Sequence, residues 1–228
     1  MHSNVSLSDG QRNLGTILRE FGDKDIDWNE ANTRIHMIDR ILVECLGWPK
    51  DPDKFKVEVH TDGDFQDYVL GSPQLVIWEA KRSGIYFDFP ADADKKSTQT
   101  ISDLFSVSKT AEAAMRQVQG YCNDAGVEFA VVCNGHQLIA FAAVRIGQSW
   151  LKGRALVIRS LQHLHNEFPV VWQCLSPDGI IEKRLLSFLT TGSTRSIPQN
   201  YQPICFIFRR SAIKANSKPT SGLLLNYF

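Results

Sequence analysis

The chain lacks the features that mark secreted and membrane proteins. No apolar run in the sequence approaches the roughly 20 residues that cross a bilayer. The first residues, MHSNVSLSDGQRN, lack the basic and apolar regions of a signal peptide. The five cysteines are odd in number and show no CxxC spacing, which predicts reduced thiols rather than a disulfide framework. These absences predict a cytoplasmic protein that does not act at a membrane.

The chain also has little net charge, no nucleotide-binding loop and no internal repeat. No GxxxxGK[ST] pattern occurs, so ATP binding is not expected in this chain. The net charge is zero, yet residues 1–150 hold 15 basic and 22 acidic side chains, whereas residues 151–228 hold 10 basic and 3 acidic. A basic region beside an acidic one suits a polyanionic substrate, although ordinary solvated surface explains the same distribution.

What the chain does contain is enough apolar sequence for one good-sized core, with 43% hydrophobic residues. Its periodicity predicts an α/β fold in the order helix, three strands, helix, two strands. The first helix, from about Trp28 to Leu46, has an apolar stripe and an expected capping box of Asp27 with Glu30. The stripe consists of Ile35, Ile38, Leu42 and Cys45. The other expected helices span 109–124, 155–165 and 178–189, and the expected strands span 55–60, 65–70, 75–81, 129–133 and 136–144.

The second and third expected strands carry the most informative residues of the chain. A hairpin centred on Pro73 would set Asp67 directly opposite Glu79, with Cβ atoms about 5 Å apart. Glu79 and Lys81 are two residues apart and therefore share a face. Two carboxylates on a buried strand need a compensating cation, which Lys81 and a hard divalent ion with oxygen ligands would supply. A shift of one residue would separate the acids, and a cross-strand ion-pair cluster is the alternative interpretation.

This arrangement, with D…ExK on strands two and three, resembles the PD-(D/E)XK nuclease superfamily. The stretches NEANTRIHMIDRILVECLGW, DYVL, LVIWEAKR, QVQGY and FAVVCNGHQLIAF are similar to the N-terminal nuclease domain of type I restriction enzyme R subunits and of related anti-phage proteins. The likeness covers about residues 28–145 and continues more weakly to about residue 190. It implies a restriction-endonuclease-like fold, with a mixed central sheet flanked by helices.

The resemblance also implies a role for each site residue. Asp67 and Glu79 match the metal-binding acids, joined by the Ala80 carbonyl, and Lys81 matches the lysine that positions the attacking water. Glu30 matches the acid of the first helix that completes the metal site, although the capping box explains it equally well. Gln117 and Tyr121 match the QxxxY element of the RecB-like branch, although a place on an ordinary helix surface would also account for them. Gln66 stands where the motif name has proline.

The function implied by the resemblance is a Mg²⁺-dependent DNA endonuclease, with Mn²⁺ as a substitute ion, acting as the effector of a restriction or anti-phage system. Its expected partner is double-stranded DNA, together with a regulatory ATPase or sensor domain in a longer chain, and a homo-oligomer is left open. The alternative is a catalytically inactive module that binds DNA or protein. The expected organisation is an arm over residues 1–27, a nuclease core over 28–150 and a basic extension over 151–228, packed on the core or leading to a further domain.

Overall fold

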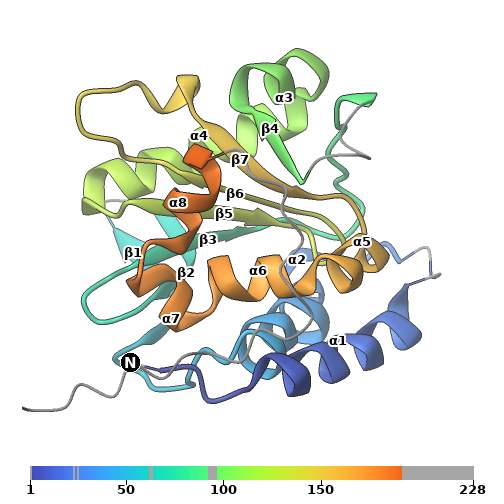
Figure 1. Ribbon diagram of the computed structural model, residues 1–228. Helices are drawn as coiled ribbons and strands as arrows, with labels where there is room; N and C mark the ends of the chain where they lie inside the picture. Colours follow the sequence, from blue (N-terminus) through green and yellow to red (C-terminus); the bar gives the residue numbers. More distant parts are fainter. Residues whose placement is uncertain (1, 23, 25, 62–63, 92–96, 192–228) are drawn as a thin grey trace, which may run out of the picture. The chain divides into compact units, whose positions relative to one another are not determined.

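A computed structural model describes residues 2–22, 24, 26–61, 64–91 and 97–191 of the chain. The part up to Ile197 forms one compact unit, built as a sheet between two layers of helices (Figure 1). The fold is therefore α/β, as the alternation of helical and strand periodicity predicts. Within the described residues, no helix combines the length and the apolarity needed to cross a membrane.

The sheet has seven strands in the order β1-β2-β3-β5-β6-β7-β4. Strands β1, β2 and β3 form an antiparallel meander, β3 and β5 run parallel, and the remaining pairs are antiparallel. Parallel neighbours require a long connection, and α4 (Lys109–Ala125) lies within the one that joins β3 to β5. The strands are β1 (Phe55–Thr61), β2 (Asp64–Leu70), β3 (Val76–Ala80), β4 (Thr98–Thr100), β5 (Phe129–Cys133), β6 (Leu138–Ala142) and β7 (Arg154–Ile158).

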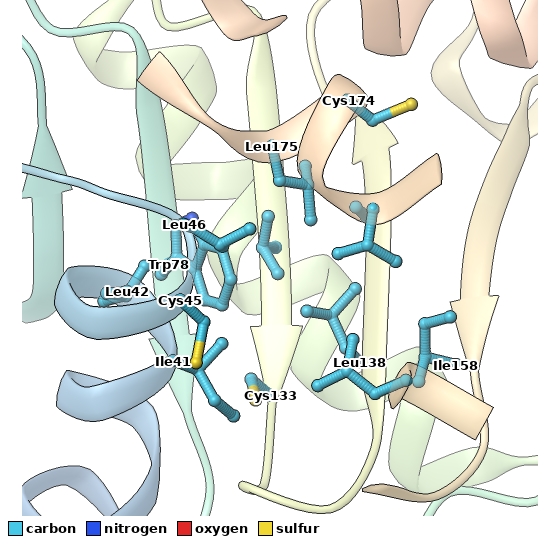
Figure 2. Close-up of a cluster of buried hydrophobic side chains, with 14 of the residues drawn as sticks. Ile41, Leu42, Cys45, Leu46, Trp78, Cys133, Leu138, Ile158, Cys174 and Leu175 are labelled. Atoms are coloured by element: carbon cyan, nitrogen blue, oxygen red, sulfur yellow. The ribbon is translucent and has the colours of Figure 1, made fainter. Parts of the chain in front are cut away.

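A hydrophobic core lies on each face of the sheet. On one face, β3 contributes Trp78 to a cluster with the N-terminal helices and with the helices that follow β7. Figure 2 shows part of this cluster, with Leu138 and Ile158 on neighbouring strands and Ile41 and Leu175 on helices. On the other face, alternate strand residues pack against α4 and α3 (Ile101–Val107). Strand β3 is buried along its whole length and lies between β2 and β5, so the expectation that the acids stand on a buried strand is confirmed.

The expected first helix is confirmed over most of its length, but its start and its buried stripe differ from prediction. The N-cap of α2 (Glu30–Thr33) is Asn29, whose side chain accepts a hydrogen bond from Asn32 N, so the capping box of Asp27 with Glu30 is wrong. The helix continues through two π-helical turns, η1 (Arg34–Ile38) and η2 (Ile41–Cys45). A π-helical turn holds more residues than an α-helical turn, so the side chains point in other directions than α-helical spacing predicts. Ile35 is therefore exposed, contrary to the predicted apolar stripe.

The segment after residue 150 contributes to the same sheet. The helix expected over residues 155–165 is wrong in its first half, since β7 occupies that place and pairs with both β6 and β4. The helix expected over 178–189 is divided at Lys183, whose φ is 54°. The helices after β7 are α5 (Leu161–Asn166), α6 (Phe168–Leu175), α7 (Pro177–Ile181) and α8 (Arg184–Thr191).

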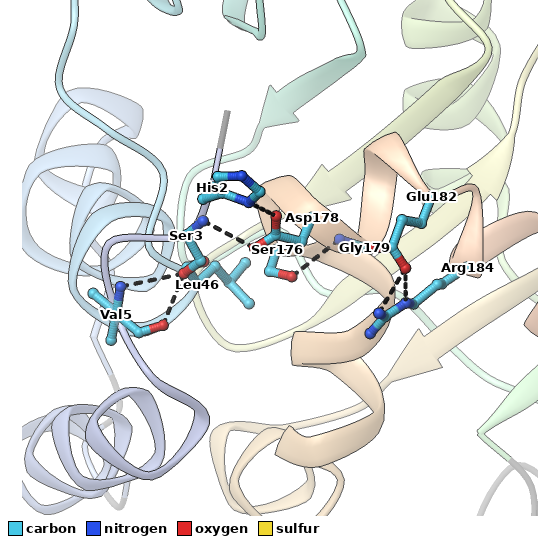
Figure 3. A network of polar contacts seen from close by, with 9 residues as sticks. All are labelled: His2, Ser3, Val5, Leu46, Ser176, Asp178, Gly179, Glu182 and Arg184. Atoms are coloured by element: carbon cyan, nitrogen blue, oxygen red, sulfur yellow. Dashed lines mark hydrogen bonds and ion pairs between the residues drawn. The ribbon is translucent and has the colours of Figure 1, made fainter. Parts of the chain in front are cut away.

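The N-terminal residues are also held within this unit. Helix α1 (Leu7–Phe21) buries Leu14 and Ile17 in the core below the sheet. Ahead of it, Ser3 N donates to Asp178 Oδ2 at the start of α7, at 3.0 Å, and the Ser3 hydroxyl donates to the Leu46 carbonyl (Figure 3). The described residues of the expected arm and of the expected extension up to Thr191 thus share one core, and residues 192–228 of that extension lie outside the described residues.

Candidate functional site

The candidate site begins at the point where β2 and β3 separate. The antiparallel register pairs Leu70 with Val76 and Tyr68 with Trp78, and the next position along both strands holds Asp67 and Glu79. This is the register that the hairpin centred on Pro73 predicts. Asp67 and Glu79 lie on the α4 face of the sheet, in line with the buried residues Val69 and Ile77 of the same strands.

The Asp67 carboxylate is fixed by the main chain of β3. Its Oδ2 atom accepts a hydrogen bond from Ala80 N at 2.7 Å. Its Oδ1 atom faces the guanidinium of Arg34, whose Nη1 lies 3.4 Å away. The residue is only 8% exposed. One carboxylate oxygen is therefore held by the backbone, and the other meets a cationic side chain.

Glu79 and Lys81 form the second part of the site. Lys81 Nζ lies 2.6 Å from Glu79 Oε1, and Glu79 is 3% exposed. The other oxygen, Glu79 Oε2, is buried and accepts no hydrogen bond from the described residues. Burying a carboxylate oxygen without a hydrogen-bond donor costs free energy. The unsatisfied Glu79 Oε2 is therefore the strongest indication that the site binds a ligand.

Helix α4 covers this face and connects to the lysine. Lys81 Nζ also donates to Gln117 Oε1 at 3.0 Å, and Gln117 Nε2 donates to the Tyr121 hydroxyl at 3.0 Å. Residues four apart on a helix point in the same direction, and these two form one chain of hydrogen bonds ending at Lys81. The sequence-predicted residues of strand β3 and helix α4 are thus brought together.

Glu30 lies within electrostatic range of the acid pair, since its charge acts on Glu79 and the charge of Asp67 acts on it. Desolvation is the largest cause of the raised pKa of Glu30 and the charge of Asp67 adds to it, whereas Lys81 and Arg34 lower this pKa. In the described part of the chain, no group of three or more His, Cys, Asp or Glu side chains is arranged to hold a metal. The two strand acids are therefore the assembled part of the predicted metal set, and the contribution of Glu30 stays a prediction.

Burial perturbs the protonation of the two strand acids. It raises the pKa of Glu79 to about 7, despite the neighbouring Lys81 ammonium, and the charges of Asp67 and Glu30 add to this rise. Burial also raises the pKa of Asp67, against the lowering effects of the Ala80 N–H and Arg34. Since desolvation is the largest cause in both, a cation placed between the acids would stabilise their ionised forms.

Two further residues belong to this site and were not assigned to it from sequence. Arg34 Nη1 donates to Glu58 Oε1 at 3.0 Å as well as facing Asp67. Glu58 stands on β1 at the position opposite Asp67, between the pairs Val57 with Tyr68 and Val59 with Gln66. A first hairpin turning about Asp62-Gly63 would have placed Glu58 there, so the Asp-Gly pair was the available signal.

The site residues suit a hard divalent cation in their chemistry. Carboxylate oxygens are the preferred ligands of Mg²⁺, and a lone Glu79 oxygen buried beside a second carboxylate leaves an acceptor for such an ion. A separate surface pocket, lined by Arg145, Arg154 and Leu186 among others, lies at β6, β7 and α8, away from these acids. That pocket contains none of the predicted site residues.

Comparison of the chain with protein-family models, with curated proteins and with solved structures finds no match in any of the three. Fold and site together define the class of this protein as an α/β protein with a seven-stranded mixed sheet. Where β2 and β3 part, it carries a buried acid pair with a lysine and an arginine.

Proposed function

We propose that this protein is a Mg²⁺-dependent DNA endonuclease, with a restriction-endonuclease-like fold and its active site at Asp67, Glu79 and Lys81. The observation that carries the proposal is the buried Glu79 Oε2, which has no hydrogen-bond donor among the described residues and stands one strand from Asp67. Two buried acids side by side are unfavourable unless a cation joins them. The order of helices and strands, and the place of Gln117 and Tyr121 on α4, are those expected from the resemblance to the PD-(D/E)XK nuclease superfamily.

Each residue has a distinct part in the proposed reaction. Mg²⁺ bound at the acids would polarise a phosphodiester and lower the pKa of a coordinated water. Asp67 and Glu79, with the Ala80 carbonyl and Glu30, would hold the ion. Lys81 would position the attacking water and stabilise negative charge on the phosphate, because Glu79 and Gln117 hold its ammonium in place.

The proposed substrate is double-stranded DNA, and the proposed setting is a cytoplasmic restriction or anti-phage system. A nuclease of this kind must be restrained in its own cell, which supports control by an ATPase or sensor domain in a longer chain. We infer that the basic balance of residues 151–228 contributes to DNA binding.

The proposal is tested by incubating plasmid DNA with the protein, with and without Mg²⁺. Alanine at Glu79 or Lys81 should abolish cleavage, because the first removes a proposed metal ligand and the second the group that positions water. Lys109→Ala is a matched control, because Lys109 is an exposed lysine whose ion pair is with Glu112. Cleavage by the Lys81→Ala protein at the rate of the parent would overturn the assignment.

A second candidate, a catalytically inactive DNA-binding module, is favoured by one observation. The acids of the described chain do not form a ready group of three metal ligands. The same assay separates the candidates, since a gel shift with DNA that persists without any nicking, with Mg²⁺ or Mn²⁺ present, would favour the binding module.

A further inference from the structure

Arg34 occupies the one oxygen of Asp67 that the main chain leaves open. Oδ2 is taken by Ala80 N at 2.7 Å, whereas Oδ1 lies 3.4 Å from Arg34 Nη1. A cation that used Asp67 as a ligand through its open oxygen would meet the guanidinium at that atom. Arg34 and a metal ion are therefore competitors for Oδ1.

The guanidinium is held in this place by contacts other than Asp67. It stacks over the Tyr68 ring, with its central carbon 5.0 Å from the ring centroid, and Nε donates to the Tyr68 hydroxyl at 3.4 Å. That hydroxyl in turn donates to Asp39 Oδ1 at 2.8 Å. The side chain of Arg34 is 14% exposed and projects from a π-helical turn, a feature common at functional sites.

Glu58 offers Arg34 a second carboxylate that a metal would leave unoccupied. The distance from Nη1 to Glu58 Oε1 is 3.0 Å, shorter than the distance to Asp67. Glu58 has a φ of 52°, a left-handed conformation that non-glycine residues seldom adopt, inside a strand. The side chain is 68% exposed, so packing in the core does not account for the strained backbone at Glu58. Its ion pair with Arg34 is the contact that the side chain makes from this position.

We propose that Arg34 is the resident counter-cation of Asp67, that a divalent metal ion displaces it from Oδ1, and that Glu58 then retains the displaced guanidinium. The inference rests on the proposed function in one respect, since the competitor is the metal of that site. Arg34 and Glu58 are positioning residues here, because they act on the metal site through Asp67.

The charges around Asp67 explain why both residues are needed. Without metal, Arg34 and Lys81 offset the charges of Asp67 and Glu79, which keeps two buried carboxylates tolerable. With metal bound, Arg34 becomes a surplus positive charge close to the ion. Glu58 neutralises that surplus at the strand edge, so its loss should weaken metal binding only while Arg34 is present.

The experiment is titration of the full chain with Mn²⁺ in a calorimeter at about pH 8, where acids of ordinary or moderately raised pKa are ionised. The proteins are the parent, Arg34→Gln, Glu58→Gln and the double variant. Arg82→Gln is the matched control, because it removes a neighbouring arginine whose ion pair is with Asp27. This variant should bind Mn²⁺ much like the parent.

Arg34→Gln should lower the Kd for Mn²⁺ by roughly fivefold, because the competitor for Oδ1 is removed. Glu58→Gln should raise the Kd roughly threefold in the parent and by less than half of that factor in the Arg34→Gln background. Weaker Mn²⁺ binding by Arg34→Gln, or an equal effect of Glu58→Gln in both backgrounds, would overturn the inference.

Thermal denaturation of the same variants, with and without Mn²⁺, gives a second measurement. Arg34→Gln should melt below the parent in the metal-free state and gain more from Mn²⁺, because the ion replaces the missing counter-charge. Because the Glu58 side chain is exposed, the Glu58→Gln protein is expected to fold. It therefore still tests the inference if the Arg34→Gln protein does not fold. Failure of the parent itself to bind Mn²⁺ would overturn the proposed function together with the inference, whereas unchanged affinities among the variants would overturn the inference alone.

Discussion

The Glu79 carboxylate is buried, and its ion pair with Lys81 offsets only part of the free energy needed to remove its charge from water. One oxygen is paired with Lys81 and the other has no donor among the described residues. The resulting pKa of about 7 means that the group exchanges its proton in the pH range in which it would have to bind a cation. Proton and metal therefore compete for Glu79, and metal affinity is expected to rise with pH through this range.

The raised pKa predicts how stability depends on pH in the absence of metal. Because the folded protein holds the Glu79 proton more tightly than the unfolded chain does, this residue makes stability fall as pH rises from its ordinary value of 4.5 to about 7. The loss is on the order of 3 kcal/mol. Glu79→Gln should remove this component, as measured by urea unfolding in EDTA across about pH 5 to 8.

The control for this measurement is Glu112→Gln, since Glu112 is a helix-surface acid whose pKa is lowered by hydrogen bonds and ion pairs with Lys109 and Arg116. Its titration falls below the tested range, so its slope should match that of the parent. Identical pH slopes for the parent and Glu79→Gln would contradict the prediction.

The sequence allowed Asp67 and Glu79 to be paired because a short turn and two apolar runs define a hairpin register. The same reasoning did not reach Arg34, since its partners depend on the π-helical turn that redirects it. The ion pairs of Arg34 with Asp67 and Glu58 run from a helix to two strands, and no spacing rule within one helix predicts them.

At the scale of elements, the turn between β5 and β6 supports the strand end next to Lys81. Lys81 N donates to the Cys133 carbonyl at 2.8 Å, and Asn134 follows directly. The Asn134 side chain accepts from His136 N and Gln137 N and donates to the Ile85 carbonyl and Gln137 Oε1. This residue is fully buried and closes the four-residue turn between β5 and β6.

Asn134→Ala should therefore destabilise the protein by about 2 to 4 kcal/mol, because it leaves buried donors and acceptors unsatisfied. Urea unfolding followed by circular dichroism measures the effect. Asn166→Ala is the matched control, since the Asn166 side chain is exposed and bonded to Gln162 on the same helix. A change at Asn134 no larger than that at Asn166 would contradict the structural role.

Elements after residue 142 were harder to predict for a physical reason. The segment RALVI has the apolar character of either a buried helix or a buried strand, and periodicity alone does not separate them. Its pairing with β4, a strand of three residues, joins segments that are far apart in the sequence, and local periodicity does not reveal such a pairing. By contrast, α4 was predicted nearly to its ends, because buried residues such as Ala111, Met115 and Cys122 recur at helical spacing and Gly126 ends the helix with a φ of 66°.

At the scale of the whole unit, the sheet continues past residue 150. Strand β7 lies between β6 and β4, and its buried residues serve both cores, with Leu156 and Ile158 on one face and Ala155 and Val157 on the other. Helices α5 to α8 then cover the face that the N-terminal helices share. Both cores therefore include residues beyond position 150.

A fragment of residues 1–150 should fail to fold, because it loses β7 with its two strand pairings and the helices that cover one core. A fragment ending at Ile197 should keep the secondary structure and cooperative unfolding of the full chain, since it contains the whole compact unit. Circular dichroism and thermal unfolding of the two fragments test this. Cooperative unfolding of the shorter fragment would show that β7 and its helices are dispensable.

The parallel pairing of β3 with β5 also sets the time at which the site is assembled during synthesis. Asp67, Glu79 and Lys81 leave the ribosome together on one hairpin, whereas the helix carrying Gln117 can settle only after β5 has docked beside β3. The β6 and β7 strands that complete the sheet emerge later still. A nascent chain thus carries the acids well before Gln117 of α4 can bond Lys81, so the full set of contacts around the site forms only in the finished unit.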